Sequence, residues 1–248
     1  MNILEVVGLT KFFGGYKAVV DFDMIIKQGE LLGLVGPNGA GKTTVFNMIT
    51  GFITPTKGKI IFKGKEITSL KPHKRAALGI VRTFQNTELF SSLTVEDNVT
   101  LGCHLMEKGG IRRFFFGEKK DEISKLRERV NEIISFTGLE NRRYHRASDL
   151  PYGEQRVLEI AIALGANPTL LLLDEPVAGM NPAETKRCMG LLHQIIEKGT
   201  TVLLVEHDMK AVMNNCERVI VMNAGEKLAE GTPSYIQAHP EVIRSYLG

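Results

Sequence analysis

Hydrophobic residues in the first third of the chain follow the period of β-strands and then change to the period of a helix. Phe22, Met24 and Ile26 recur at every second position, roughly as in a half-buried strand. From Lys42 the spacing becomes helical, and Gly51 is placed to end that helix. The strand candidates of this part are residues 3–9, 22–26, 31–35, 59–62 and 80–84.

The middle of the chain carries the spacing of amphipathic helices. Thr94 and Asp97 resemble a capping pair that opens a helix running towards Met106. Hydrophobic residues at helical spacing from Ile123 onwards mark a second helix, which stops at Gly138. A third helix is expected over about residues 153–164.

Short apolar runs and helical segments alternate in the last third. Residues 170–173 fit a fully buried strand, and Asn181, Pro182 and Glu184 supply the N-cap, first-turn proline and acidic third position of a helix. Such alternation predicts a mostly parallel sheet covered by helices, with ligands at the carboxyl ends of its strands. The other elements expected here are strands at 201–205, 219–222 and 227–229, and helices at 182–198 and 208–215.

Composition narrows the class of protein. Of 248 residues, 43% are hydrophobic and 24% charged, which favours a folded globular chain over a disordered one. The net charge of +3 indicates no polyanionic partner, so we expect no nucleic acid, and the basic cluster 71–75 is expected on a solvated face. Three well-separated cysteines favour a reducing compartment. We expect neither a secretory signal nor a membrane span, so a membrane role would need a partner.

A phosphate-binding motif follows the apolar run 31–35. Residues 36–43 match G-x-x-x-x-G-K-[ST] between an expected strand and an expected helix. Glycines let successive amides point at phosphate oxygens, and the helix start adds its positive dipole end. Lys42 would reach the β- and γ-phosphates of ATP, and the Thr43 hydroxyl would coordinate Mg²⁺. The residues expected to contact the nucleotide here are Gly36, Pro37, Asn38, Gly39, Ala40, Gly41, Lys42, Thr43 and Thr44.

Two acidic residues come directly after the buried strand 170–173. Asp174 suits a magnesium ligand, usually through water, and Glu175 suits a base that orients and deprotonates the attacking water. In the alternative interpretation, both carboxylates cap the turn at Pro176. Beside a phosphate loop, the catalytic interpretation is the favoured one.

Together with these motifs, further short segments make the chain resemble the ATPase subunits of ABC transporters over nearly its whole length. Residues 83–86 resemble the Q-loop, whose Gln85 would sense the metal and the γ-phosphate. Residues 150–155 resemble the LSGGQ signature, which places Gly153 against a nucleotide in trans. Residues 205–208 carry the switch histidine, His207, which would stabilise γ-phosphate charge together with Lys42. Phe13 matches the aromatic residue that stacks on adenine, although Phe12 and Tyr16 are near enough to replace it.

The resemblance implies an α/β fold and a set of partners. The fold is a P-loop NTPase core with a mostly parallel sheet, an N-terminal antiparallel β portion and a helical lobe. We expect residues 1–86 and 165–248 to form the core and residues 87–164 to form the lobe. A second ATPase subunit, identical or different, would close a head-to-tail dimer around two ATP molecules. Transmembrane permease subunits would bind the lobe, a substrate-binding protein would act indirectly, and the chain would lie peripherally on the cytoplasmic face of the cell membrane.

Two departures from the family pattern narrow the subgroup. Pro151 stands where the signature has serine, and Asn181 stands where the D-loop has aspartate. Together with the residues around 153–160 and 178–182, they make the chain similar to the ATPases of branched-chain amino-acid importers. The alternatives are the ATPase of a lipid or lipopolysaccharide exporter, a soluble non-transport ABC ATPase, and a P-loop kinase for a small molecule.

Overall fold

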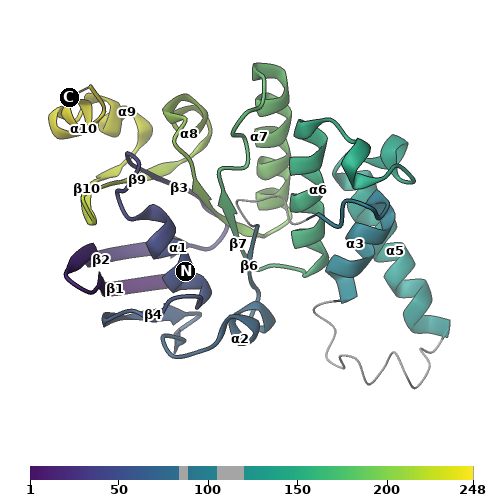
Figure 1. Cartoon of the computed structure of the whole chain (residues 1–248), viewed down its shortest axis with the longest axis horizontal. Coiled ribbons are helices and arrows are strands. Elements are labelled where there is room, and N and C mark those ends of the chain that lie inside the picture. The colour runs from purple at the N-terminus through teal and green to yellow at the C-terminus, as the bar shows by residue number, and fades with distance from the viewer. Residues whose placement is uncertain (84–88, 105–119, 248) are drawn as a thin grey trace.

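The first of the two β-sheets in the described part of the chain is antiparallel and is built mainly from the N-terminal residues (Figure 1). The computed structural model describes residues 1–83, 89–104 and 120–247. The strand order in this sheet is β2-β1-β4-β5. Hydrophobic residues of β2 are buried at alternate positions, which confirms the predicted half-buried strand. Its strands are β1 (Asn2–Phe13), β2 (Tyr16–Lys27), β4 (Lys57–Phe62) and β5 (Lys65–Glu66).

The second sheet is mostly parallel, as predicted. Its order is β10-β9-β3-β8-β7-β6, and only the edge pair β9–β10 is antiparallel. The carboxyl ends of β3, β7 and β8 therefore meet at one edge, where the candidate residues follow them. Its strands are β3 (Leu31–Val35), β6 (Ile80–Arg82), β7 (Leu170–Asp174), β8 (Thr201–Val205), β9 (Arg218–Asn223) and β10 (Glu226–Gly231).

Both faces of the parallel sheet are buried, which is why its strands are continuous hydrophobic runs. Leu170 and Leu172 face the core that contains α1 (Lys42–Thr50) and the antiparallel sheet. Leu171 and Leu173 face the other core, which α7 (Pro182–Glu197) and α8 (Met209–Asn215) cover. This alternation fixes the register of β7, because a slip by one residue would exchange the two faces.

A helical lobe lies on the far side of α7 (Figure 1). Its described residues include α3 (Val95–His104), α5 (Lys120–Phe136) and α6 (Tyr152–Gly165), together with short 3₁₀ turns at Glu140–Arg142 and Ala147–Asp149. The predicted capping pair is confirmed: the Thr94 hydroxyl accepts from the Asp97 amide at 3.1 Å and donates to the Asp97 carboxylate at 2.6 Å. The first of these helices was expected to run towards Met106, but residues 105 and 106 lie outside the described residues. The boundaries between core and lobe stay predictions.

The short helix α2 (Pro72–Ala77) agrees with the expected solvated basic face at Lys71, His73 and Lys74, which are exposed, but not at Arg75. Arg75 is only 1% exposed. Its guanidinium donates to the carbonyls of Met48 and Ile49 at 2.6 and 2.8 Å and also binds the carbonyls of Thr68 and Leu70. Burial lowers its pKa to about 10. Arg75 thus satisfies carbonyls at the end of α1 that have no partner inside the helix.

The C-terminal part contains two helices that the sequence patterns did not predict. They are α9 (Pro233–Ala238) and α10 (Pro240–Leu247), and both lie beside β9 and β10 at the end of the molecule opposite the lobe (Figure 1). The Thr232 side chain caps α9 by accepting from the Tyr235 amide. Within the described residues, no helix combines the length and hydropathy that a membrane span requires.

Candidate functional site

The phosphate loop connects β3 to α1 and leaves the start of that helix open. Gly41 is the N-cap of α1, with φ of 101°, and among the described residues no side chain caps this helix and no acidic residue lies in its first turn. A Cβ atom on Gly41 would lie 2.6 Å from the Ala18 carbonyl, so only glycine fits there. Amides of a first helical turn have no intrahelical acceptor. The loop therefore presents uncapped N–H groups to an anion.

Lys42 is the cation of this loop, and it is 7% exposed. Its ammonium donates to the carbonyls of Gly36 at 2.7 Å and Pro37 at 3.2 Å. Burial lowers the pKa of Lys42, whereas the nearby carboxylates of Glu175 and Asp174 raise it. The side chain is thus already folded over the loop, where phosphate oxygens would replace carbonyl oxygens as its acceptors.

Asp174 ends β7 and is 2% exposed. Its carboxylate pairs with Arg82 at the end of β6, with 3.1 Å between Nη2 and Oδ2. Burial raises the pKa of Asp174, and the Arg82 guanidinium counteracts that shift. Arg82 also binds the Asn47 side chain on α1 and lies over the Phe46 ring. These contacts favour a role of Asp174 in the site over a turn cap.

Sequence reasoning missed the part that Arg82 takes in the site. The residue belongs to the stretch that resembles the Q-loop, but its contacts to β7 and α1 depend on tertiary structure. In the sequence, the positive charge of Arg82 at the end of an otherwise apolar strand was the feature that could have indicated this role. Gln85, three residues further on, lies outside the described residues, so its predicted role stays a prediction.

Glu175 and His207 lie together at the ends of β7 and β8. The distance from His207 Nδ1 to Glu175 Oε1 is 3.5 Å. Glu175 has φ of 52°, a left-handed conformation that costs a non-glycine residue roughly 1–2 kcal/mol. Its amide donates to the Val205 carbonyl at 2.9 Å. The Glu175 side chain is thereby aimed at the site rather than along the strand.

A cavity of about 240 Å³ joins the phosphate loop to Glu175. The structure thus brings Lys42, Glu175 and Asp174 together, with His207 beside them. Gly153 and Phe13 are not among the residues that line this cavity. Those that do are Tyr16, Ala18, Asn38, Gly39, Ala40, Gly41, Lys42, Thr43, Thr44 and Glu175.

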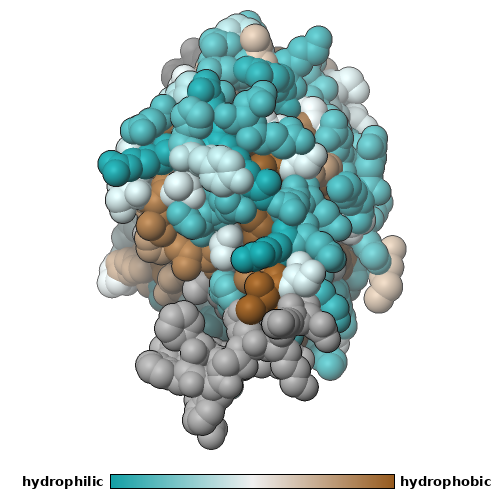
Figure 2. Space-filling view, turned by 90° about the vertical axis from the view of Figure 1, so that its right-hand side faces the viewer, coloured by the Kyte–Doolittle hydropathy of each residue, from teal (hydrophilic) through white to brown (hydrophobic). Residues whose placement is uncertain are grey.

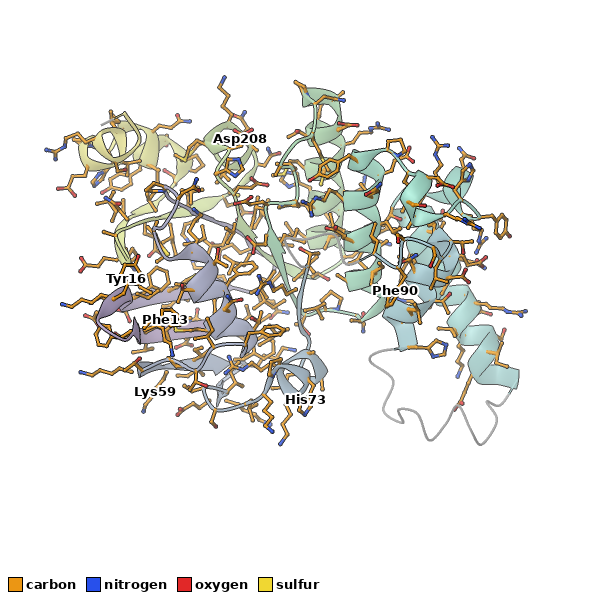
Figure 3. The ribbon with its side chains drawn as sticks, viewed as in Figure 1. Phe13, Tyr16, Lys59, His73, Phe90 and Asp208 are labelled. Carbon is orange, nitrogen blue, oxygen red and sulfur yellow. The ribbon has the colours of Figure 1, made fainter. Side chains whose placement is uncertain are left out.

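Two aromatic residues lie near the cavity, at the turn between β1 and β2 (Figure 3). Phe13 and Tyr16 are a cross-strand pair. The Lys11 ammonium lies 5.1 Å from the centroid of the Phe13 ring and also binds the Thr54 carbonyl. Phe13 is 47% exposed and Tyr16 is 62% exposed. Phe13 is thus the ring with a fixed neighbour, whereas Tyr16 is the ring that lines the cavity.

Phe13→Ala is expected to raise the dissociation constant of a fluorescent ATP analogue about tenfold, because stacking of a base on an aromatic ring is worth roughly 1–3 kcal/mol. Tyr16→Ala is the matched variant across the same turn and should change the constant by less than about twofold, because the family resemblance assigns the stacking to Phe13 although Tyr16 lines the cavity. Equilibrium titration measures both. The reverse ranking would transfer the adenine platform from Phe13 to Tyr16.

Gly153 lies in the first turn of α6, directly after Tyr152 and the N-cap Pro151. A Cβ atom on Gly153 would lie 3.0 Å from the Glu184 carboxyl group, so a side chain there would displace Glu184. Glu184 closes a capping box with Asn181 at the start of α7. In this chain Asn181 is therefore a helix cap, and contacts of Gly153 to a second chain stay a prediction.

Comparison with known proteins places these features in a family. Residues 19–178 match the family model described as ABC transporter, and residues 226–248 match the one described as branched-chain amino acid ATP-binding cassette transporter. The chain is 42% identical to the high-affinity branched-chain amino acid transport ATP-binding protein BraF of Pseudomonas aeruginosa, over 99% of this chain and 98% of that protein. It is 35% identical to the lipopolysaccharide export system ATP-binding protein LptB of Haemophilus influenzae, over 100% of this chain and 98% of that protein.

Solved structures agree with this placement. A nucleotide-free ATP-binding cassette from an ABC transporter superposes with a TM-score of 0.88 at 30% identity, covering 100% of both chains. A dimeric cassette in a post-hydrolysis state, bound to ADP and phosphate, superposes with a TM-score of 0.79 at 27% identity, covering 93% of this chain and 99% of that one. The predicted α/β fold is confirmed.

Proposed function

The chain belongs to the family of ABC transporter ATP-binding subunits, and from this premise we propose that it powers the import of branched-chain amino acids. As a member of the family it binds and hydrolyses ATP for transport. The substrate class is inferred from the relatives, because substrate recognition belongs to other subunits. In support, identity is 42% to BraF and 35% to LptB. The lipopolysaccharide exporter ATPase is therefore the less favoured alternative.

One observation supports the catalytic proposal above all. The uncapped start of α1, the buried carboxylate of Asp174 and the Glu175–His207 pair lie at the same edge of the parallel sheet. Loop amides and Lys42 would bind the β- and γ-phosphates. Glu175 would take the proton of the attacking water, and His207 with Lys42 would stabilise charge at the γ-phosphate. Most of the rate acceleration would come from positioning and electrostatics.

Residues of this site also fit a magnesium ion. Asp174 offers a buried carboxylate at the end of β7, and Thr43 lines the cavity at the start of α1; carboxylate and hydroxyl oxygens are ligands that Mg²⁺ prefers. Gln85 would complete the set. When bound, the ion would neutralise charge that develops on the phosphate oxygens. Asp174 and Thr43 would hold that ion at the carboxyl end of β7 and the start of α1.

We further propose that the chain acts in a head-to-tail dimer at the cytoplasmic face of the membrane. Gly153 of one subunit would contact the nucleotide held by the other, and the second subunit would be identical or different. Permease subunits would bind the pair, and a substrate-binding protein would act through them. The dimeric form of a related cassette supports this arrangement.

An apolar groove of about 440 Å³ between α2 and the lobe is the proposed contact for a permease helix. Figure 3 shows His73 on the α2 side and Phe90 on the lobe side. In Figure 2, hydrophobic side chains gather near the grey segment on a face that is otherwise mostly hydrophilic. Phe52 and Phe90, both of which line the groove, are more than half exposed, at 55% and 53%. Exposed aromatic residues in an apolar groove favour a partner helix.

Phe90→Glu is expected to abolish co-purification of permease proteins from detergent-solubilised membranes, because a charge would enter the apolar groove. Tyr235→Glu is the matched control. Tyr235 is also 53% exposed but lies on α9, far from the groove (Figure 1). Mass spectrometry identifies the captured proteins, and calorimetry should show unchanged ATP binding for both variants.

Transport by the purified complex tests the substrate class. Proteoliposomes that contain the wild-type complex and its binding protein should take up labelled leucine in an ATP-dependent manner, and unlabelled isoleucine or valine should compete. Capture of lipopolysaccharide-binding membrane proteins instead, without leucine uptake, would support the alternative. Equal capture by Phe90→Glu and wild type would remove the groove from the interface.

A further inference from the structure

Glu206 is a buried acid that the proposed mechanism does not use. It follows β8 directly, precedes His207, and is 0% exposed. Oε1 accepts a hydrogen bond from the Val177 amide at 3.0 Å. Oε2 is equally buried and has no hydrogen-bond partner within the described part of the chain. Burying a polar atom without a partner costs folding free energy, so we expect Glu206 to have a function that offsets this cost.

The bond to Val177 lies two residues after the strained backbone of Glu175. A turn bond from the Ala178 amide to the Glu175 carbonyl lies within this stretch, and two further hydrogen bonds connect it to the end of β8. The Glu175 amide donates to the Val205 carbonyl at 2.9 Å, and the Val177 amide donates to the Glu206 carboxyl group. A left-handed conformation at a non-glycine residue persists only where its surroundings hold it. Glu206 is one of these two anchors.

The same residue also adjoins the switch histidine. His207 is the next residue in the chain, and its ring lies 3.5 Å from the Glu175 carboxylate. Burial raises the pKa of Glu206, whereas hydrogen bonds from the Val177 and His207 amides and the nearby His207 ring counteract the shift. One buried side chain thus connects the segment after Glu175 to the segment that carries His207.

We propose that Glu206 is a positioning residue of ATP hydrolysis, which holds the Glu175 backbone in its left-handed conformation and in register with His207. The inference rests on the proposed role of Glu175 as the base. It assigns Glu206 no contact with nucleotide or water. Its effect is expected on the rate of the chemical step and not on nucleotide affinity.

Two substitutions separate the hydrogen bond from the volume of the side chain. Glu206→Gln keeps an acceptor for the Val177 amide and should retain kcat within about threefold of wild type. Glu206→Met fills similar space without an acceptor and should lower kcat about 10- to 100-fold, the range that a small misplacement of a catalytic group costs. The KM for ATP and the dissociation constant for ADP should stay within about twofold for both.

Amide exchange measures the position of the segment independently of activity. In wild type and Glu206→Gln, the Val177 amide should exchange slowly, as a buried and bonded amide does. In Glu206→Met, peptides that cover residues 174–181 should exchange faster. Fast exchange at Val177 in the wild-type chain would already overturn the proposal, even if the methionine variant failed to fold.

The double variant Glu175→Gln with Glu206→Met tests whether both residues act on one step. Its kcat should be no lower than that of Glu175→Gln alone, because positioning a missing base has no effect. Additive losses would overturn the proposal. Full turnover by Glu175→Gln alone would refute the base assignment, whereas wild-type turnover by Glu206→Met would refute only the positioning role.

Glu30 provides a matched control in the same chain. It is also a buried acid, at 6% exposed, but it pairs with Arg218 at 2.7 Å at the opposite end of the parallel strands. Glu30→Gln should lower the thermal midpoint without a change in kcat. A parallel fall of kcat in Glu30→Gln and Glu206→Met would indicate a general loss of stability and would contradict the specific role of Glu206.

Discussion

Glu175→Gln is expected to lower kcat for ATP hydrolysis by about 100- to 10,000-fold, the contribution of a positioned general base. The amide keeps the size of the side chain and its place beside His207, but it cannot accept the proton of the attacking water. In the proposed site nucleotide binding depends on the loop and on Lys42, so the affinity for ATP should stay within about twofold. Steady-state release of phosphate and calorimetry measure the two quantities.

The same variant should accumulate an ATP-bound dimer, because the family resemblance implies that hydrolysis separates the two subunits of the proposed dimer. Size-exclusion chromatography with ATP should show that species for Glu175→Gln and not for the wild-type chain. Glu217→Gln is the matched control, since Glu217 is an exposed acid outside the cavity. Wild-type turnover in Glu175→Gln would falsify the assignment of Glu175 as the base.

Elements with a complete local signal were predictable from the sequence. The strand 31–35 and the strand 201–205 agree with the structure residue for residue, because both are short, mainly apolar segments bounded by polar or turn residues. The start of α7 at Asn181 agrees as well, since a capping box is a contact between near neighbours. The phosphate loop was visible for the same reason, as its residues are consecutive.

Residues whose role depends on long-range contacts were not predictable. Arg75 is buried because it binds carbonyls of α1, 26 and 27 residues away. Arg82 binds Asp174, 92 residues away, and the Val177 amide binds Glu206, 29 residues away. Charge alone predicts solvent exposure for such residues. Their burial follows from unpaired backbone groups and from a partner that only the folded sheet supplies.

Local sequence patterns also failed to predict the C-terminal helices and to single out the aromatic ring that stacks on adenine. Helices α9 and α10 are short, and their strongest signals are prolines at the first turn rather than a long hydrophobic period. At the turn between β1 and β2, three aromatic residues lie within five positions, and the choice of Phe13 among them rested on the family resemblance rather than on local spacing. In the structure Phe13 contacts the Lys11 ammonium, whereas Tyr16 lines the cavity. The binding measurements on the two alanine variants decide which ring stacks on adenine.

Lys42→Ala is expected to weaken ATP binding by about 10- to 100-fold, as the loss of charge-assisted hydrogen bonds worth roughly 1.5–3 kcal/mol predicts. Removal of the ammonium leaves the loop amides and the open start of α1 in place, so some affinity for phosphate should remain. Adenosine carries no phosphate, so its weaker binding should not change. Calorimetry with ATP, ADP and adenosine measures this graded loss.

The grading with phosphate number distinguishes a phosphate contact from damage to the loop. Lys42 also donates to the Gly36 and Pro37 carbonyls, so Lys42→Ala could in principle alter the loop itself. In that case adenosine and ATP would weaken together, and the thermal midpoint without nucleotide would fall. Lys59→Ala is the control for loss of one positive charge, since Lys59 is exposed on β4 away from the loop (Figure 3). An ATP affinity of Lys42→Ala equal to that of Lys59→Ala would contradict the phosphate-loop assignment, because no other described cation lines the cavity.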